Sequence, residues 1–210
     1  MSNYKTKDET LQLTGTSISN LDSNPAIATK LQVFGFTTES LNEGKQLLAV
    51  ATVKSQEQKK EIGEQHSATE RSNELFSMAE ARFKVIYKIS RVAITEKGLQ
   101  DQLGVVSLEK SAFDSWAQSR LDFYANALSI PAVMDRMGRF NIKAEYLTDA
   151  KKLVEDAIAA NQIQQKETGE ARMATSERND AFDELKAWYD ELRLVAKLAL
   201  DKRECEIIGL

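Results

Sequence analysis

The chain has 210 residues, of which 42% are hydrophobic and 29% charged, and its net charge at pH 7 is −4. This length and composition allow one large domain or two small domains with a buried core. The net charge provides no broad basic surface, so we expect neither nucleic acid nor an anionic membrane as a partner.

Cysteine use and the N-terminal residues indicate a cytoplasmic protein. The single cysteine, Cys205, excludes an intramolecular disulfide framework and fits a reducing compartment. The first nine residues lack the apolar segment of a secretory signal. No apolar run approaches the roughly 20 residues that a membrane span requires. We therefore expect a cytoplasmic chain that does not cross a membrane.

The second half of the sequence repeats the first half at an offset of 106 positions, which relates Gly63 to Gly169. Over the central part of each half the alignment needs no gap, and roughly 18 of about 60 pairs are identical. The two prolines of the chain also occupy equivalent places. The sequence therefore predicts a tandem duplication, with one helical-bundle repeat over 1–105 and the other over 106–210.

The first element of each repeat is clearer in the second copy than in the first. Residues 107–129 carry apolar side chains at roughly helical spacing, which predicts a helix. Residues 5–22 are rich in Ser and Thr and contain Gly15. Because these residue types compete with helical hydrogen bonds or lower helix propensity, a helix there remains doubtful.

A short helix follows in each repeat, opened by Pro25 or by Pro131 at its first turn, where the missing N–H costs nothing. The expected ends of these helices are Gly35 and Asn141. Gly and Asn are the residues that best tolerate a left-handed conformation, and an apolar residue follows each of them. The pattern predicts a Schellman-type helix end in both repeats.

A third helix is predicted to begin near Thr38 and near Ala144, and a fourth is patterned around Phe76 and Phe182. Their apolar side chains recur at spacings of three and four, which is the helical period. The small residue Gly44 in the third helix predicts a close helix contact. No stretch alternates with period two, so we predict an all-α fold.

The polar stretch between the third and fourth helices has two interpretations. In the first, Gly63 and Gly169 end a helix and the chain reverses into an antiparallel hairpin. In the second, each glycine is tolerated inside a continuous helix of about 60 residues, at a cost of about 1 kcal/mol. Because the apolar stripe fades on both sides of each glycine, we favour an exposed tip. We therefore predict two antiparallel helical bundles with long helical hairpins.

No group of residues predicts catalysis, a cofactor or a metal ion. The single histidine, His66, corresponds to Arg172 in the other repeat and lacks the partners of a triad or a zinc site. Phosphate-binding and dinucleotide-binding loops are absent from the sequence. Glu61 and Glu64 lie among polar residues, where helix lysines are their simplest partners. We expect a protein that is not an enzyme, with no catalytic, cofactor-binding or metal-binding residue.

The polar stretch has nevertheless diverged less than the rest of the repeat. About 9 of 18 pairs are identical over 56–73, against about 9 of 42 over the remaining gap-free alignment. Turn geometry with helix caps is one explanation, and a binding surface displayed twice is the other. The candidate partner-binding residues are Gln56, Lys60, Glu61, Glu64, Thr69, Asn73, Gln162, Lys166, Glu167, Glu170, Thr175 and Asn179.

The expected function is that of a non-enzymatic interaction or scaffold module. It would bind a protein partner, or a second copy of itself, through the two polar stretches. The alternative is a helical bundle that encloses a small ligand or a metal ion between its helices.

Overall fold

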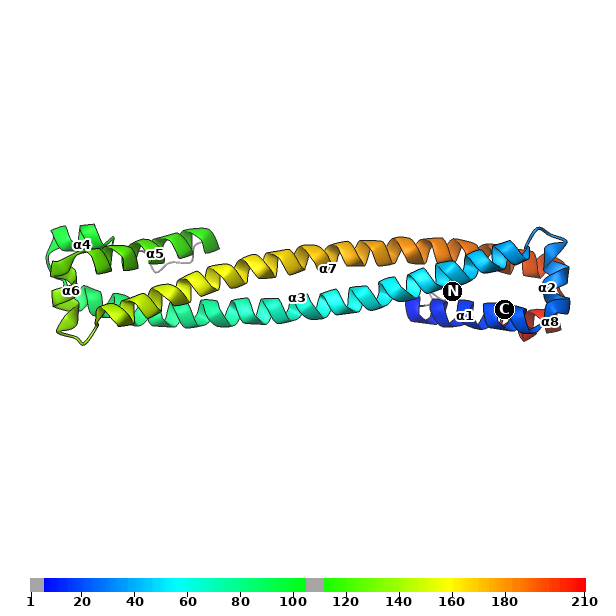
Figure 1. The fold of residues 1–210 in the computed structure, drawn as a ribbon, viewed down its shortest axis with the longest axis horizontal. Helices are drawn as coiled ribbons and strands as arrows, with labels where there is room; N and C mark the ends of the chain where they lie inside the picture. Colours follow the sequence, from blue (N-terminus) through cyan, green and yellow to red (C-terminus); the bar gives the residue numbers. More distant parts are fainter. Residues whose placement is uncertain (1–5, 105–111) are drawn as a thin grey trace. The chain divides into compact units, whose positions relative to one another are not determined.

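The computed structural model describes residues 6–104 and 112–210, and in these ranges the chain is helical with no strand. The predicted all-α class is therefore confirmed. The helices, labelled in Figure 1, are α1 (Lys7–Ser23), α2 (Pro25–Gln32), α3 (Thr38–Ala93), α4 (Lys97–Leu103), α5 (Phe113–Ser129), α6 (Pro131–Gly138), α7 (Ala144–Ala199) and α8 (Lys202–Ile207). No helix among the described residues is long and apolar enough to cross a membrane.

The chain forms two compact units, and each contains part of both long helices. The first unit consists of residues 1–63 and 169–210, and the second consists of residues 64–168. Each unit therefore combines residues from both halves of the sequence. The predicted repeats, which meet at residue 105, were defined by sequence similarity. The division into compact units does not test them, so they stay a prediction.

The helix α1, which the composition left doubtful, begins at a capping box. The Thr6 hydroxyl accepts a hydrogen bond from the backbone N–H of Glu9 at 3.3 Å, and the Glu9 carboxylate accepts one from the backbone N–H of Thr6 at 2.7 Å. These two bonds satisfy N–H groups that the first helical turn leaves without partners. The equivalent helix α5 begins at Phe113, and residues 107–111 of its predicted range lie outside the described residues.

The predicted proline-initiated helices α2 and α6 are present, and both end as expected. Gly35 and Asn141 adopt φ values of 86° and 61°. The backbone N–H of Phe36 donates to the carbonyl of Leu31 at 3.2 Å, and the N–H of Ile142 makes the equivalent bond at 3.2 Å. These are the long bonds of a Schellman motif, so the two helix ends were predicted correctly.

The predicted hairpin turns at Gly63 and Gly169 are wrong. Both α3 and α7 run without a break through the polar stretch, and each helix is 56 residues long. An added Cβ at either glycine would meet no atom within 4 Å, so neither position lies in a crowded turn. The helical penalty for glycine, about 1 kcal/mol, is small enough for packing elsewhere along the helix to offset.

Burial along α3 explains why the helix does not stop. Covered positions keep a spacing of three and four through the polar stretch, as in the seam of a coiled coil. Ser55, Gln58 and Ser72 are buried, and Ile62, Gln65 and Thr69 are half-buried. The covered face therefore changes from apolar to polar side chains without ending. The fading apolar stripe marks a polar seam, not an exposed tip.

Within the first unit, the stretches of α3 and α7 run in opposite directions. The indole N–H of Trp188 donates to the carbonyl of Ser40 at 2.9 Å, while Lys54 Nζ lies 2.8 Å from a carboxylate oxygen of Glu177. Rising numbers on one helix therefore face falling numbers on the other. The core of this unit is apolar and includes Ile18, Leu21, Ile27, Leu31, Phe36, Trp188, Tyr189, Leu192, Ala196 and Ile208.

The second unit contains a charged pair inside an aromatic core. Arg120 is only 2% exposed, and its Nη2 lies 3.4 Å from Glu80 Oε2. The indole N–H of Trp116 donates to the same oxygen at 2.7 Å. The guanidinium group of Arg120 also lies 4.6 Å from the ring centroid of Phe83. Glu80 is therefore the group that compensates the buried positive charge.

Candidate functional site

The twelve predicted residues lie on the middle of α3 and α7 and differ in exposure. Exposed members are Gln56, Lys60, Glu64, Asn73, Gln162 and Lys166. Half-buried members are Glu61, Thr69, Glu167, Glu170, Thr175 and Asn179. Some of the residues that the two polar stretches share therefore lie in the covered seam, and others face outward. The reasons for their identity differ between these two groups.

The outward positions follow one face of each helix. A spacing of four places successive side chains on the same face of an α-helix. On α3 this row is Gln56, Lys60 and Glu64, and on α7 it is Gln162, Lys166 and the half-buried Glu170. We call these two rows the repeated polar faces. Gly63 and Gly169, which precede the last member of each row, are exposed as well.

The two threonines have a role inside their own helices. The Thr69 hydroxyl donates to the backbone carbonyl of Gln65 at 2.8 Å, and the Thr175 hydroxyl donates to that of Ala171 at 2.8 Å. Such a bond to the preceding turn satisfies a hydroxyl group that lies on a covered helix face. Packing in the polar seam is therefore enough to explain why both repeats have threonine at this position.

The same ion pair forms on both helices. Lys60 Nζ lies 3.2 Å from a carboxylate oxygen of Glu61, and Lys166 Nζ lies 3.3 Å from a carboxylate oxygen of Glu167. Both lysine side chains are largely exposed. The carboxylates of Glu61 and Glu167 are half-buried, but an ion pair whose lysine is largely exposed contributes only about 1 kcal/mol to stability. The stability of the fold is therefore a weak reason for both repeats to keep them.

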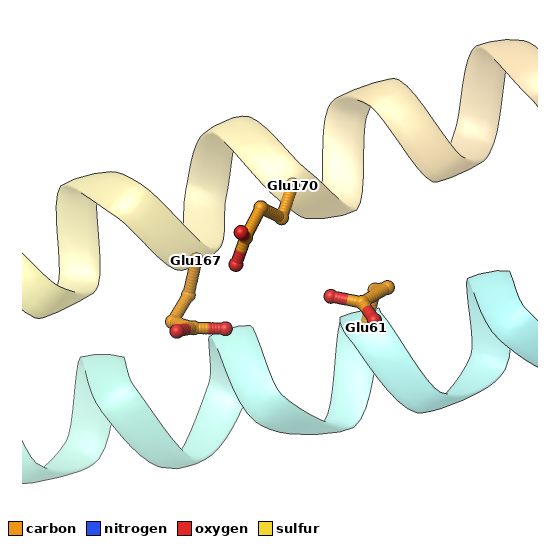
Figure 2. A group of neighbouring side chains, drawn as sticks. All are labelled: Glu61, Glu167 and Glu170. Atoms are coloured by element: carbon orange, nitrogen blue, oxygen red, sulfur yellow. The ribbon is translucent and has the colours of Figure 1, made fainter.

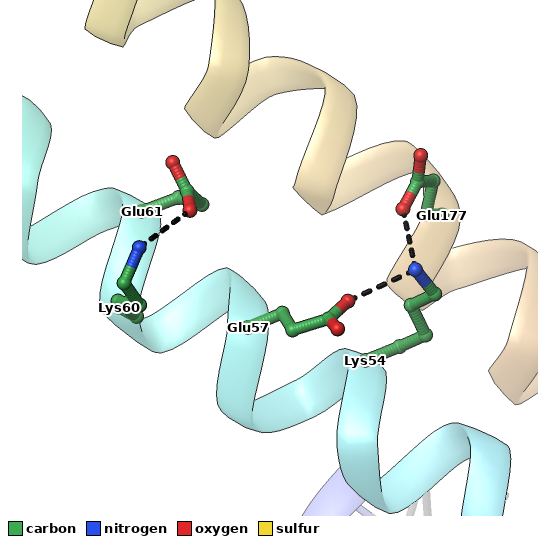
Figure 3. A network of polar contacts seen from close by, with 5 residues as sticks. All are labelled: Lys54, Glu57, Lys60, Glu61 and Glu177. Carbon is green, nitrogen blue, oxygen red and sulfur yellow. Dashed lines mark hydrogen bonds and ion pairs between the residues drawn. The ribbon is translucent and has the colours of Figure 1, made fainter.

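A further ion-pair network lies beside the polar stretch in the first unit, as Figure 3 shows. Lys54 Nζ lies 2.8 Å from Glu177 and 2.9 Å from Glu57, so it connects α3 with α7. The hydrogen bond to Glu177, with a second one to Glu57, raises the pKa of Lys54 above its ordinary value. Sequence spacing gives no signal for the pair between Lys54 and Glu177, because it depends on how the two helices align.

Three carboxylates of the predicted set, Glu61, Glu167 and Glu170, are drawn in Figure 2. In the first unit, carboxylate oxygens of Glu61 and Glu170 lie within 4.8 Å of each other, and Glu167 precedes Glu170 by one helical turn on α7. Carboxylate oxygens are the ligands that calcium and magnesium prefer. All three side chains are only half-buried, however, and Glu61 already pairs with Lys60. We assign no metal ion to them.

The prediction missed two glutamines of the polar seam. Gln58 is only 7% exposed, and Gln164, at the equivalent position 106 residues later, is half-buried. Glutamine occupies both positions, 106 residues apart, and this match between the repeats could have drawn attention to them. Both belong to the row of covered positions, so their polarity helps to make the seam polar where the apolar stripe fades.

A groove of about 340 Å³ lies in the second unit, between α3, α7 and the first residue of α5. Its lining residues are Thr69, Ser72, Asn73, Phe76, Phe113, Asn161 and Gln164. The groove therefore brings two members of the predicted set, Thr69 and Asn73, together with residues that the prediction did not include. The remaining ten members do not line it.

Comparisons with protein-family models, with curated proteins and with solved structures found no match to this chain.

Proposed function

We propose that the chain is a non-enzymatic interaction or scaffold module that binds a protein partner, or a second copy of itself, through the repeated polar faces. Each face presents an amide, an ammonium group and a carboxylate along one side of a long helix. Groups of this kind form the directional hydrogen bonds and ion pairs of the polar part of a protein interface.

The supporting observation is that neither turn geometry nor helix caps explain why the two helices carry the same residues on these faces. A turn would have explained why both repeats have glycine at Gly63 and Gly169. Both helices continue through these residues, however, and an added Cβ at either one would meet no atom within 4 Å. Helix caps would have required polar neighbours, but neither helix begins or ends there. A partner supplies a reason, because a glycine on a helix surface lets another chain approach closely.

We also infer that the chain is a tandem duplication of one helical unit. Helices α2 and α6 begin at prolines 106 positions apart, and α3 and α7 begin at the same offset and have equal length. The equivalent helix ends at Gly35 and Asn141 also support this inference. Under this proposal the chain displays one binding face twice.

Site-specific photo-crosslinking tests the proposed function. A photoreactive amino acid at exposed Gln56 or Gln162 should crosslink one defined protein in cells, and that purified protein should bind the purified chain. Alanine substitution of four residues, Lys60, Glu64, Lys166 and Glu170, should weaken this binding about tenfold or more, which corresponds to about 1.4 kcal/mol or more. The melting temperature should stay unchanged.

The matched control replaces four exposed residues outside the polar stretches with alanine, namely Lys84, Lys88, Asp190 and Glu191. This variant also loses two cations and two anions, so a general charge effect would appear in both variants. The proposal is wrong if the two variants bind the partner equally well.

A further inference from the structure

The groove of the second unit has an uncharged polar lining. Its described lining residues are three carboxamides, two hydroxyls and two aromatic rings, and none of these described residues is an acid or a base. Phe76 and Phe113 form the aromatic part, with ring centroids 6.2 Å apart. Ser72 is buried, whereas Asn73 is exposed, so the groove extends from the helix seam to the surface.

Cationic side chains occupy the equivalent place in the first unit. The guanidinium group of Arg178 donates to Asn179 Oδ1 at 2.9 Å. The ammonium group of Lys7 donates to the same oxygen and lies 5.4 Å from the ring centroid of Phe182. Asn179 and Phe182 therefore already have partners supplied by the chain itself.

In the second unit the two cations are replaced and their partners are kept. At the offset of 106 positions, Ser72 stands in the place of Arg178 and Phe113 in the place of Lys7. Asn73 and Phe76 are identical to Asn179 and Phe182. The serine side chain is shorter than that of arginine and carries no charge. Among the described lining residues, the groove therefore presents an amide and an aromatic ring with no cation beside them.

We propose that this groove binds a neutral, polyhydroxylated ring of about monosaccharide size. Each carboxamide offers both a donor and an acceptor, which matches hydroxyl groups that donate and accept. The phenyl rings offer an apolar wall for the C–H face of such a ring. A charged ligand would lose its hydration without gaining an opposite charge, which disfavours it. A volume of about 340 Å³ lies at the lower end of the range for ligand pockets.

This ligand site is separate from the proposed protein partner, because Gln56, Lys60, Gln162 and Lys166 of the repeated polar faces do not line the groove. Either assignment can therefore fail while the other holds.

The test is saturation-transfer difference NMR of the full chain with a panel of neutral monosaccharides and their methyl glycosides. At least one neutral sugar should receive saturation, most strongly at the protons of one ring face. It should also shift the side-chain amide signals of Asn73, Asn161 and Gln164. The charged relatives gluconate and glucosamine should bind at least about tenfold more weakly, because the described residues of the lining offer them no counter-charge.

Ser72→Arg should fill the groove as Arg178 fills the equivalent space, and it should reduce sugar affinity at least about tenfold. Ser77→Arg is the matched control, since it makes the same change at an exposed position of α3 outside the groove. Asn161→Leu removes the polar atoms of one wall without adding charge and should also lower affinity. The proposal is overturned if no neutral sugar binds the wild-type chain, or if binding survives both Ser72→Arg and Asn161→Leu.

Discussion

The indole ring of Trp188 in α7 lies directly against the backbone of Gly44 in α3. A Cβ atom at residue 44 would stand 2.1 Å from Trp188 Cζ2, which is far inside any normal contact distance. The hydrogen bond from the indole N–H to Ser40 holds the ring in this place. The close contact expected from the small residue at position 44 is therefore confirmed, and its partner is a large aromatic side chain.

Gly44→Ala should lower the free energy of unfolding by about 1–3 kcal/mol, because the new methyl group forces the indole ring or a helix to move. The loss should occur although alanine favours the helix over glycine by about 1 kcal/mol. Urea denaturation followed by circular dichroism measures the change. An equal or higher stability would show that the contact is loose.

Gly63→Ala and Gly169→Ala should have the opposite effect on stability. Both residues lie inside a helix, and an added Cβ would meet no atom within 4 Å. Each substitution should therefore raise the free energy of unfolding by about 0.5–1 kcal/mol. The same denaturation assay applies, with Gly44→Ala as the contrast. A loss of stability at either position would favour the hairpin turn over the continuous helix.

Glu80→Ala should destabilise the second unit by about 3 kcal/mol, because it leaves the buried guanidinium group of Arg120 without its carboxylate. Lys186→Ala is the control at the equivalent position of the other repeat, where an exposed lysine pairs with Asp190. Its effect should stay within about 0.5 kcal/mol. The double variant Glu80→Leu, Arg120→Met should recover most of the loss in thermal melting experiments, and an additive loss would contradict this account.

Tyr124 should make stability fall at alkaline pH. Its side chain is fully buried, and burial raises the pKa of Tyr124 above its ordinary value. The folded state therefore keeps a proton that the unfolded state releases near pH 10, so the free energy of unfolding decreases as pH rises above about 10. Tyr124→Phe should reduce this decrease when denaturation is followed from pH 8 to 11. At pH 7 the variant should lose little stability, since the hydroxyl has no hydrogen-bond partner among the described residues.

The features of the fold that follow from local chemistry were predictable from the sequence. Pro25 and Pro131 start helices because proline suits the first turn, and Gly35 ends one because it accepts a positive φ. Continuity through Gly63 was not predictable in the same way. It depends on a seam in which serine and glutamine take the covered positions, and a pattern of apolar residues alone does not detect such a seam.

The candidate site was predictable only as a region. The identities at the offset of 106 positions drew attention to Lys60 and Glu61, but they did not separate outward residues from residues that face the seam. That separation depends on the rotation of each long helix about its axis. The groove depends on Ser72 and Phe113, which are distant in sequence and differ between the repeats, so similarity between the repeats directed attention away from them.

The combination of both sequence halves in each compact unit has an evolutionary consequence. Under the proposed duplication, a single repeat supplies only part of each compact unit, and it would complete the fold as a homodimer that exchanges its long helices. In such a dimer, each substitution appears twice. A fused chain is free of this constraint: one unit has Trp188 against Gly44, whereas the residues at the equivalent positions of the other unit are Arg82 and Ala150. The proposed fusion would therefore let the two units diverge independently.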